Sequence, residues 1–336
     1  MALAGLEEDI EMKRNLTLAA LFAIAAPLTA QDLGGDLALH KLLIEGEKWE
    51  LVVDGLGFAD APCGDDKGNF YYSDMRSKEG IFKVAPNGNV SPLFPESVGA
   101  QSISGAKFGP DGRLYCCQGK KQRVIAFSLP DEKMEVLAEG VRPNDLIVSH
   151  DGLLFLTETP KKQVTLINLK TKKVAAASVG VLNAPNGLTL SPGQDTLAVS
   201  DYRGLYVWTF RVGADGALDA AANYMTMRTK INPTAERGAL PAMDAFSRGD
   251  GMTMDENGRY YVATALGVQV FDPTGRECGL IPKPNDSPMT SVFLGGPGGN
   301  NLYTTCKDKI FKLKVKAKGV TPWKGASEAK AVPFKR

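Results

Sequence analysis

Short apolar segments separated by glycine-containing turns recur along the chain. In each copy a small polar residue is followed by a mostly apolar strand, a turn with glycine and a second apolar strand, which is the pattern of a β-hairpin. The copies are DAPCGDDKGNFYYSD from Asp60, SGAKFGPDGRLYCCQ from Ser104, NDLIVSHDGLLFLTE from Asn144, NGLTLSPGQDTLAVSD from Asn186, DGMTMDENGRYYVAT from Asp250 and TSVFLGGPGGNNLYTT from Thr290. Six similar hairpins predict a repeat protein built from strands.

The spacing of the copies identifies the repeat. They begin 44, 40, 42, 64 and 40 residues apart, so only the fourth interval holds an insertion, near residues 213–245. A unit of this length with room for four strands matches one blade of a β-propeller. Apolar segments that supply further strands cover residues 80–85, 123–128, 163–169, 205–212, 267–271 and 309–315, and residues 49–53 supply a closing outer strand for the last blade. We therefore predict an all-β, six-bladed β-propeller over residues 31–320.

Other architectures fit less well. A β-sandwich is the alternative, but it does not require six hairpins at a constant period. Strands alternating with long helices are absent from the pattern, which disfavours a parallel α/β fold. Lys312, Lys314, Lys316 and Lys318 alternate with apolar residues, and we interpret this segment as an outer strand whose exposed edge carries lysines.

The two ends of the chain differ from the repeat region. Lys13 and Arg14 precede an apolar run from Leu16 to Leu28, a pattern typical of an export signal and too short to span a bilayer. We expect residues 1–30 to be removed, with Met12 as an alternative start. The product is then exported, periplasmic or secreted, and has no membrane segment. Residues 321–336 form a basic C-terminal tail.

Composition narrows the chemistry. The 39 Lys and Arg residues balance 38 Asp and Glu residues, so no electrostatic footprint for nucleic acid is present. His40 and His150 are the only histidines, which excludes a three-histidine zinc centre and disfavours a Ser-His-Asp triad. The five cysteines lack C-x-x-C spacing and are odd in number, so we expect most of them to be core residues.

The leading polar residues of the six copies are expected to meet at the central channel, because the inner strand of every blade starts at the same face. All six carry a side-chain oxygen: Asp60, Ser104, Asn144, Asn186, Asp250 and Thr290. Two carboxylates among amide and hydroxyl oxygens suit a hard divalent cation. Calcium fits best because its coordination is flexible, with Zn²⁺, Mg²⁺ or Mn²⁺ and a metal-free polar channel as alternatives.

The second strands end at the same face with a second set of polar residues: Asp74, Gln118, Glu158, Asp201, Thr264 and Thr304. Such residues either contact substrate or cap backbone N–H groups, and we take Gln118 and Glu158 as candidates for substrate contacts. Arg142 lies two residues before Asn144, where its guanidinium is placed to bind a carboxylate, a phosphate or a hydroxyl-rich ligand.

Four short motifs occur in order at blade spacing: RPND (142–145), PNGL (185–188), GDGM (249–252) and GVQVFDPTG (267–275). In them the chain resembles the gluconolactonase, regucalcin and diisopropylfluorophosphatase group of six-bladed calcium propellers, over nearly the whole mature chain, and the last motif looks like the bacterial gluconolactonases. The resemblance implies calcium bound by Asp60, Asn186 and Asp250. It also implies Asn144 as a ligand or substrate contact and Arg142 as a substrate contact.

Two positions depart from the family pattern. The family usually has Glu where this chain has Asp60, and bacterial members often have Asn where it has Thr290 and Ser291.

The expected reaction is hydrolysis of a lactone, with an aldonolactone as the small-molecule substrate. Calcium would polarise the carbonyl, and Asp250 would orient or deprotonate a water molecule. Arg142 and Asn144 would hold hydroxyl groups, while Ser104, Gln118, Glu158 and Thr290 complete the expected substrate contacts. The alternatives are phosphotriester or aryl ester hydrolysis at the same metal, and a non-catalytic calcium-binding or ligand-binding propeller.

Overall fold

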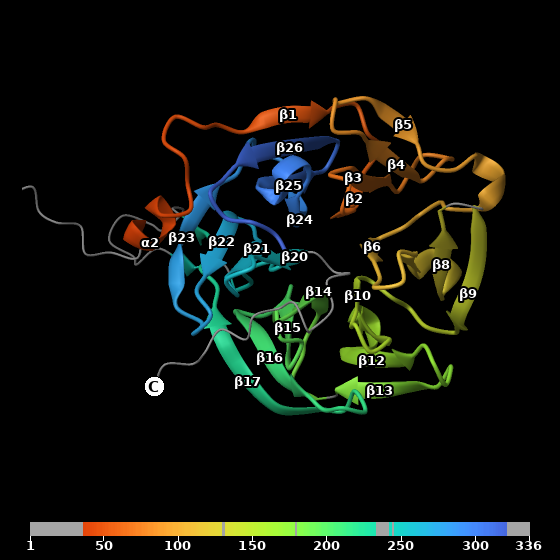
Figure 1. Cartoon of the computed structure of the whole chain (residues 1–336). Helices are drawn as coiled ribbons and strands as arrows, with labels where there is room; N and C mark the ends of the chain where they lie inside the picture. The colour runs from red at the N-terminus through yellow and green to blue at the C-terminus, as the bar shows by residue number, and fades with distance from the viewer. Residues whose placement is uncertain (1–35, 130–131, 179, 233–241, 244, 321–336) are drawn as a thin grey trace, which may run out of the picture.

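The computed structural model describes residues 36–129, 132–178, 180–232, 242–243 and 245–320. Six four-stranded antiparallel sheets are arranged around a common axis, as Figure 1 shows in a view along that axis. The blades are β2 (Ala59–Gly64), β3 (Phe70–Asp74), β4 (Ile81–Val84) and β5 (Val90–Pro92); β6 (Gly105–Phe108), β7 (Leu114–Gln118), β8 (Arg123–Ser128) and β9 (Lys133–Glu139); β10 (Leu146–Val148), β11 (Leu153–Glu158), β12 (Gln163–Asn168) and β13 (Val174–Ser178); β14 (Pro185–Leu190), β15 (Thr196–Asp201), β16 (Tyr206–Val212) and β17 (Leu218–Thr226); β20 (Met252–Met254), β21 (Tyr260–Ala263), β22 (Gly267–Phe271) and β23 (Glu277–Pro282); β24 (Met289–Gly295), β25 (Asn301–Cys306), β26 (Lys309–Lys314) and β1 (Glu50–Val53). The predicted six-bladed propeller is confirmed.

The last blade is closed by the N-terminal strand. β1 pairs antiparallel with β26, with Glu50 opposite Lys312 and Leu51 opposite Phe311. This confirms the closing strand that we predicted at residues 49–53. The interpretation of the lysine-bearing segment as an exposed edge was wrong, because β26 is the third strand of its blade and β1 covers it.

The hairpin turns explain the repeated glycine. Five copies place a glycine with φ between 75° and 81° at the turn, a left-handed conformation that residues with a Cβ adopt only with strain. In the fourth copy Gly193 comes one position early, and Gln194 takes the left-handed conformation instead, with φ of 61°. The turn geometry is therefore kept even where the glycine is displaced.

The core lies between neighbouring blades. Phe70 of β3 stacks on Tyr303 of β25 with ring centroids 4.1 Å apart, and Tyr71 meets Phe108 of β6 edge-on at 5.1 Å. Fully burying one such side chain contributes about 1.5–3 kcal/mol, so these contacts hold adjacent sheets together. The five cysteines are free and buried, as expected for core residues.

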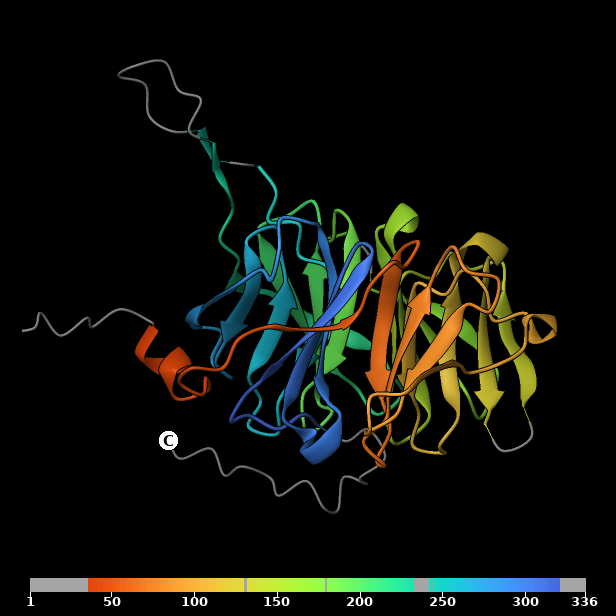
Figure 2. The same cartoon turned by 90° about the horizontal axis from the view of Figure 1, so that it is seen from above.

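Two elements lie outside the blades. The short helix α2 (Asp36–His40) places Leu39 in the apolar cluster shared by the last two blades. The insertion lengthens β17 and continues into the strand pair β18 (Ile231–Asn232) and β19 (Ala242–Met243), which stands off the body of the propeller in Figure 2.

Two segments predicted from the sequence, the export signal and the basic C-terminal tail, lie outside the described residues. Among the residues that the structure does describe, no helix has the length and apolar character needed to cross a bilayer.

Candidate active site

The six leading polar residues of the repeats lie where the inner strands begin, at one face of the propeller that we call the mouth. The backbone N–H of Asn144 donates to Thr157 O at 2.8 Å, and that of Asp250 donates to Ala263 O at the same distance. Each leading residue is thus tied to the second strand of its own blade. The local fold fixes where the backbone of each blade enters the channel.

Hydrogen bonds between blades join these strand starts into a ring. In most blades a buried or half-buried hydroxyl donates to a backbone carbonyl of the next blade. These bonds are Ser73 Oγ to Ile103 O at 2.6 Å, Ser104 Oγ to Asn144 O at 2.8 Å, Thr157 Oγ1 to Asn186 O at 2.5 Å, Ser200 Oγ to Asp250 O at 2.7 Å and Thr290 Oγ1 to Ala59 O at 2.9 Å. The ring holds the mouth residues in place before any ligand binds, as a binding site requires.

Three carboxylates meet inside this ring: Asp60, Asp145 and Asp250. Each accepts the backbone N–H of the residue that follows it, at 2.9, 2.8 and 3.0 Å respectively. Asp145 is only 6% exposed, whereas Asp60 and Asp250 are partly exposed. Gly105 packs against Asp145, and glycine is needed there because a Cβ at position 105 would lie 2.6 Å from Asp145 Oδ1.

Burial raises the pKa of all three carboxyl groups, and repulsion between carboxylates adds to the rise for Asp60 and Asp250. Burial raises the pKa of Asp60 to about 7, and the charge of Asp145 adds to the rise. Burial also raises the pKa of Asp250, and there the charges of Asp60 and Asp145 act in the same direction. The Asn186 side chain partly offsets this by hydrogen bonding to Asp250. Without a positive partner, this group of carboxylates is electrostatically unfavourable.

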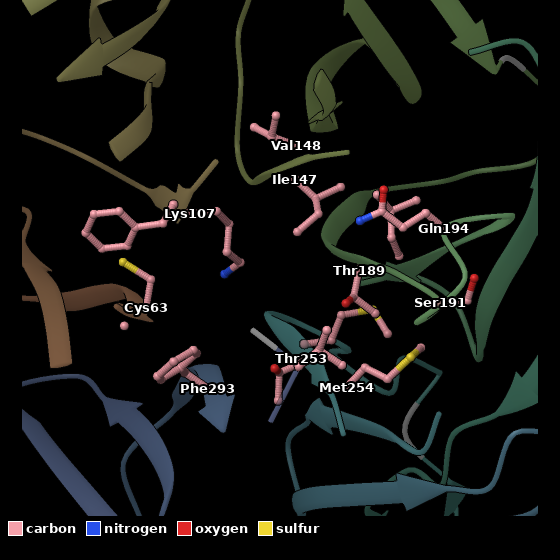
Figure 3. Close-up of a pocket in the computed structure, with 15 residues that line it drawn as sticks. Cys63, Lys107, Ile147, Val148, Thr189, Ser191, Gln194, Thr253, Met254 and Phe293 are labelled. Carbon is pink, nitrogen blue, oxygen red and sulfur yellow. The ribbon is translucent and has the colours of Figure 1, made fainter. Parts of the chain in front are cut away.

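Lys107 is a positive partner built into the channel. The residues three positions after the six leading residues all line a cavity of about 70 Å³ farther along the axis: Cys63, Lys107, Ile147, Thr189, Thr253 and Phe293. Figure 3 shows the Lys107 side chain reaching into the open centre. It is the one charged residue of this second layer, and its charge lowers the pKa of Asp60 and Asp145.

The chemistry of the donor set fits a divalent cation. Three ionised carboxylates and one ammonium carry a formal charge of −2, which one divalent ion would neutralise. In the described part of the chain, no group of three or more His, Cys, Asp or Glu residues has metal-binding geometry. A cation here would therefore be held by two carboxylates together with amide oxygens, a ligand set that a hard ion accepts.

Two cavities open at the mouth beside the ring. One, between the second and third blades, has a volume of about 500 Å³ and is lined by Ser104, Lys120, Arg142 and Asn144 among others. The other, between the third and fourth blades, has about 410 Å³ and is lined by Lys162, Asn186 and Arg203. Each cavity therefore contains one amide of the ring, and Arg142 stands exposed at the rim of the first.

Comparison with known proteins identifies the family of the chain. Residues 58–307 match the family described as SMP-30/Gluconolactonase/LRE-like region. The chain belongs to this family. A gluconolactonase of Zymomonas mobilis is 22% identical over 301 residues, which cover 80% of this chain and 82% of the relative.

Solved structures agree in fold with this SMP-30/gluconolactonase member. A gluconolactonase of Xanthomonas campestris superposes with a TM-score of 0.68 at 21% identity, covering 83% of this chain and 92% of the other. A calcium-binding regucalcin of Agrobacterium tumefaciens gives 0.63 at 14% identity, covering 82% and 96%. Membership of the gluconolactonase family supports the expectation of a lactone hydrolase.

Within this family framework, Gln118 and Glu158 are structural residues. Gln118 is fully buried and donates to Gly99 O and Gln101 O, both at 2.8 Å. Glu158 is 1% exposed and accepts the backbone N–H of Arg142 at 2.8 Å and the hydroxyl of Thr165 at 2.6 Å. Neither side chain lines either of the two described mouth cavities, and we therefore no longer count them as substrate contacts.

Ser104 and Thr290, the two hydroxyl candidates, differ in their access to the mouth. Ser104 lines the cavity between the second and third blades, although its hydroxyl already donates to Asn144 O. Thr290 is only 6% exposed, and its hydroxyl links the last blade to the first. Ser104 therefore stays a predicted substrate contact, while the hydroxyl of Thr290 supports the ring.

Sequence reasoning missed Asp145 and Lys107. Asp145 directly follows Asn144, and assigning one leading residue to each repeat hid the second polar group. Lys107 is detectable by aligning the fourth residue of every copy, where five positions are uncharged and one is lysine. Both signals are present in the register of the repeats.

Proposed function

We propose that this protein is a calcium-dependent hydrolase that opens sugar lactones. The observation that best supports this proposal is that Asp60, Asn186 and Asp250 lie in one hydrogen-bonded ring. A cavity lined by Arg142 and Asn144 lies beside this ring. Family membership supports the reaction type. The calcium-binding regucalcin, which shares the fold, supports the choice of ion.

Asp60, Asn186 and Asp250 would hold the calcium, with Asn144 as a further ligand or as a substrate contact. The formal charge of −2 and the all-oxygen donors favour calcium over Zn²⁺, which prefers nitrogen and sulfur ligands. When bound, the ion would supply Lewis acidity that polarises the lactone carbonyl and stabilises the developing oxyanion.

The side chains of the chain itself would orient substrate and move the proton. Arg142 and Asn144 would hold hydroxyl groups of the sugar ring, with Ser104 beside them, so that the ester faces the channel. Asp250 would orient a water molecule and take its proton as the water oxygen bonds to the carbonyl carbon. When the ring C–O bond breaks, the same proton passes to the departing ring oxygen, which leaves as a hydroxyl group.

The first experiment is initial-rate hydrolysis of glucono-1,5-lactone by the purified protein before and after EDTA treatment. We expect chelation to abolish turnover and added Ca²⁺ to restore it. Full activity after metal removal, verified by metal analysis, would contradict the calcium mechanism.

A panel of chromogenic aryl esters and phosphotriesters, assayed alongside, separates the alternative activities. Hydrolysis of those compounds without lactone hydrolysis would reassign the site to an esterase. Calcium binding with no turnover of any compound would reassign it to a binding protein.

We also propose that the protein is exported. The charged segment, the apolar run and the small residues before Gln31 support this assignment. Cell fractionation followed by N-terminal sequencing tests it, and a cytoplasmic product that retains residues 13–30 would contradict it.

A further inference from the structure

The two mouth cavities are lined by cations and contain no carboxylate. Lys120 and Arg142 line the cavity between the second and third blades, and Lys162 and Arg203 line the cavity between the third and fourth. All four side chains are exposed. Among the described residues, none of the four is paired with an acidic side chain. Their charges therefore remain available to a ligand.

The acids that end the second strands of the third and fourth blades are already occupied. Glu158 pairs with Lys161 at 2.9 Å and accepts three further hydrogen bonds inside the blade. Asp201 is 1% exposed and accepts the backbone N–H groups of Asn183 and Ala184. The mouth of these two blades thus presents positive charge, while the carboxylates of Glu158 and Asp201 are used inside the blades.

The four charged side chains of the lining offer only donors, beside amide and hydroxyl groups that can also accept. Lysine and arginine side chains donate hydrogen bonds and accept none, whereas a sugar hydroxyl is satisfied best when it does both. An anionic group accepts hydrogen bonds without having to donate any. The planar guanidinium of arginine can donate two parallel hydrogen bonds to a carboxylate or phosphate.

The local fold also holds Arg142 in position. Its backbone N–H is fixed by Glu158, and the buried Pro143 follows it with a restricted φ. The guanidinium therefore starts from a rigid base at the rim, next to Asn144 of the ring. A ligand that reaches from the ring to the rim would place its far end beside Arg142 and Lys120.

We propose that the substrate is an anionic sugar lactone, with a carboxylate or phosphate group at the end remote from the ester. The anion lies in the cavity between the second and third blades, against Arg142 and Lys120. This inference rests on the proposed lactonase function and specifies its substrate class.

The kinetic test uses lactones matched in ring size. Glucaro-1,4-lactone is compared with glucono-1,4-lactone for the carboxylate, and 6-phosphoglucono-1,5-lactone with glucono-1,5-lactone for the phosphate. At low salt we expect kcat/KM to be about tenfold higher for one anionic member, as one charge-assisted contact predicts, and to lose this advantage at high salt. Whichever pair shows the preference identifies the anion.

Neighbouring lysines supply the variant and its control. Lys120→Gln should lower the anionic-to-neutral ratio of kcat/KM about threefold or more, because one of the two charges is lost. Lys121→Gln changes the adjacent exposed lysine, which lines neither cavity, and should leave the ratio unchanged. Equal kcat/KM for both members of both pairs, or equal effects of the two variants, would overturn the proposal.

A binding measurement separates this inference from the lactonase function. Calorimetry compares glucitol with glucitol 6-phosphate and with glucarate, none of which is a lactone. If no lactone is hydrolysed but an anionic compound binds and Lys120→Gln weakens it, the lactonase function fails and the anion site stands. If neutral lactones are hydrolysed and neither anion binds better than glucitol, the anion site fails and the lactonase function stands.

Discussion

Asp250 and Asp201 are the same residue type at the same face of neighbouring blades, yet they are used differently. Both oxygens of Asp201 accept backbone N–H groups, from Ala184 at 2.8 Å and Asn183 at 2.9 Å, and the side chain is 1% exposed. Asp250 accepts the N–H of Gly251, lies beside two other carboxylates and is partly exposed. The first carboxylate stabilises a loop, and the second is available to a ligand.

This difference extends to the two rings of polar residues. At the ends of the second strands, Asp74, Glu158 and Asp201 fix the loops that lead into the inner strands. At the starts of the inner strands, the carboxylates face one another. The outer ring therefore positions the inner ring, and the two should respond in opposite ways to substitution.

The largest expected effect is on turnover when Asp250 is changed. Asp250→Asn keeps the shape and removes the charge and the proton acceptor, so we expect hydrolysis to fall by about 10³-fold. The melting temperature should not fall, because the change relieves repulsion among the three carboxylates. The matched control is Asp66→Asn in the exposed β2–β3 turn, which should retain full activity. A loss of stability that parallels the loss of rate would argue against this assignment.

The corresponding change in the outer ring should affect stability. Asp201→Asn places an amide nitrogen against a backbone donor, and we expect the free energy of unfolding to drop by about 2 kcal/mol. Chemical denaturation measures this drop. Turnover per folded molecule should change far less than for Asp250→Asn, and a comparable loss of rate would put the outer ring in the active site.

Lys107 gives a third comparison, between the two layers of the channel. Lys107→Met removes the positive charge facing the carboxylates, so calcium should bind more tightly by about 1 kcal/mol, or roughly fivefold. Titration calorimetry on the variant and on Lys67→Met, which alters an exposed turn lysine, checks this. Unchanged calcium affinity would show that Lys107 is not the counter-charge of the site.

The smallest expected effect is on the pH dependence of the metal-free protein. The pKa of Asp60 is raised to about 7 in the folded chain, so the folded state binds a proton more tightly than the unfolded state. The stability gained by protonation is complete at low pH and is lost as the pH rises through 7. In EDTA, the melting temperature should therefore fall by about 2–4 °C between roughly pH 5 and pH 8. Asp60→Asn should make the curve shallower, and a flat wild-type curve would contradict the prediction.

Much of the fold could be predicted because the same hairpin pattern occurs six times along the sequence. The hairpin pattern, the turn glycines and the spacing all depend on short-range chemistry, and the closing strand follows from counting strands. The edge lysines were misread because alternation alone does not show which strand covers which. That is decided by β1, which lies far away in sequence.

The site was less predictable for a related reason. Starting positions of strands locate Asp60, Asn186 and Asp250, but an oxygen-bearing residue at a strand end looks the same whether it faces the channel or the backbone. Gln118 and Glu158 could be separated from Asn144 only by their hydrogen-bond partners. Lys107 lies in the middle of an apolar strand, where its role depends on neighbours contributed by other blades.

Pairing of the first strand with the last one has a consequence for biosynthesis. Glu50–Val53 emerges early from the ribosome and has no partner until Lys309–Lys314 has been made. Five blades can assemble in order during synthesis, whereas the circle is completed only by the final residues of the propeller. A chain still in production therefore cannot close the circle, and its first strand stays an unpaired edge until the last strand is available.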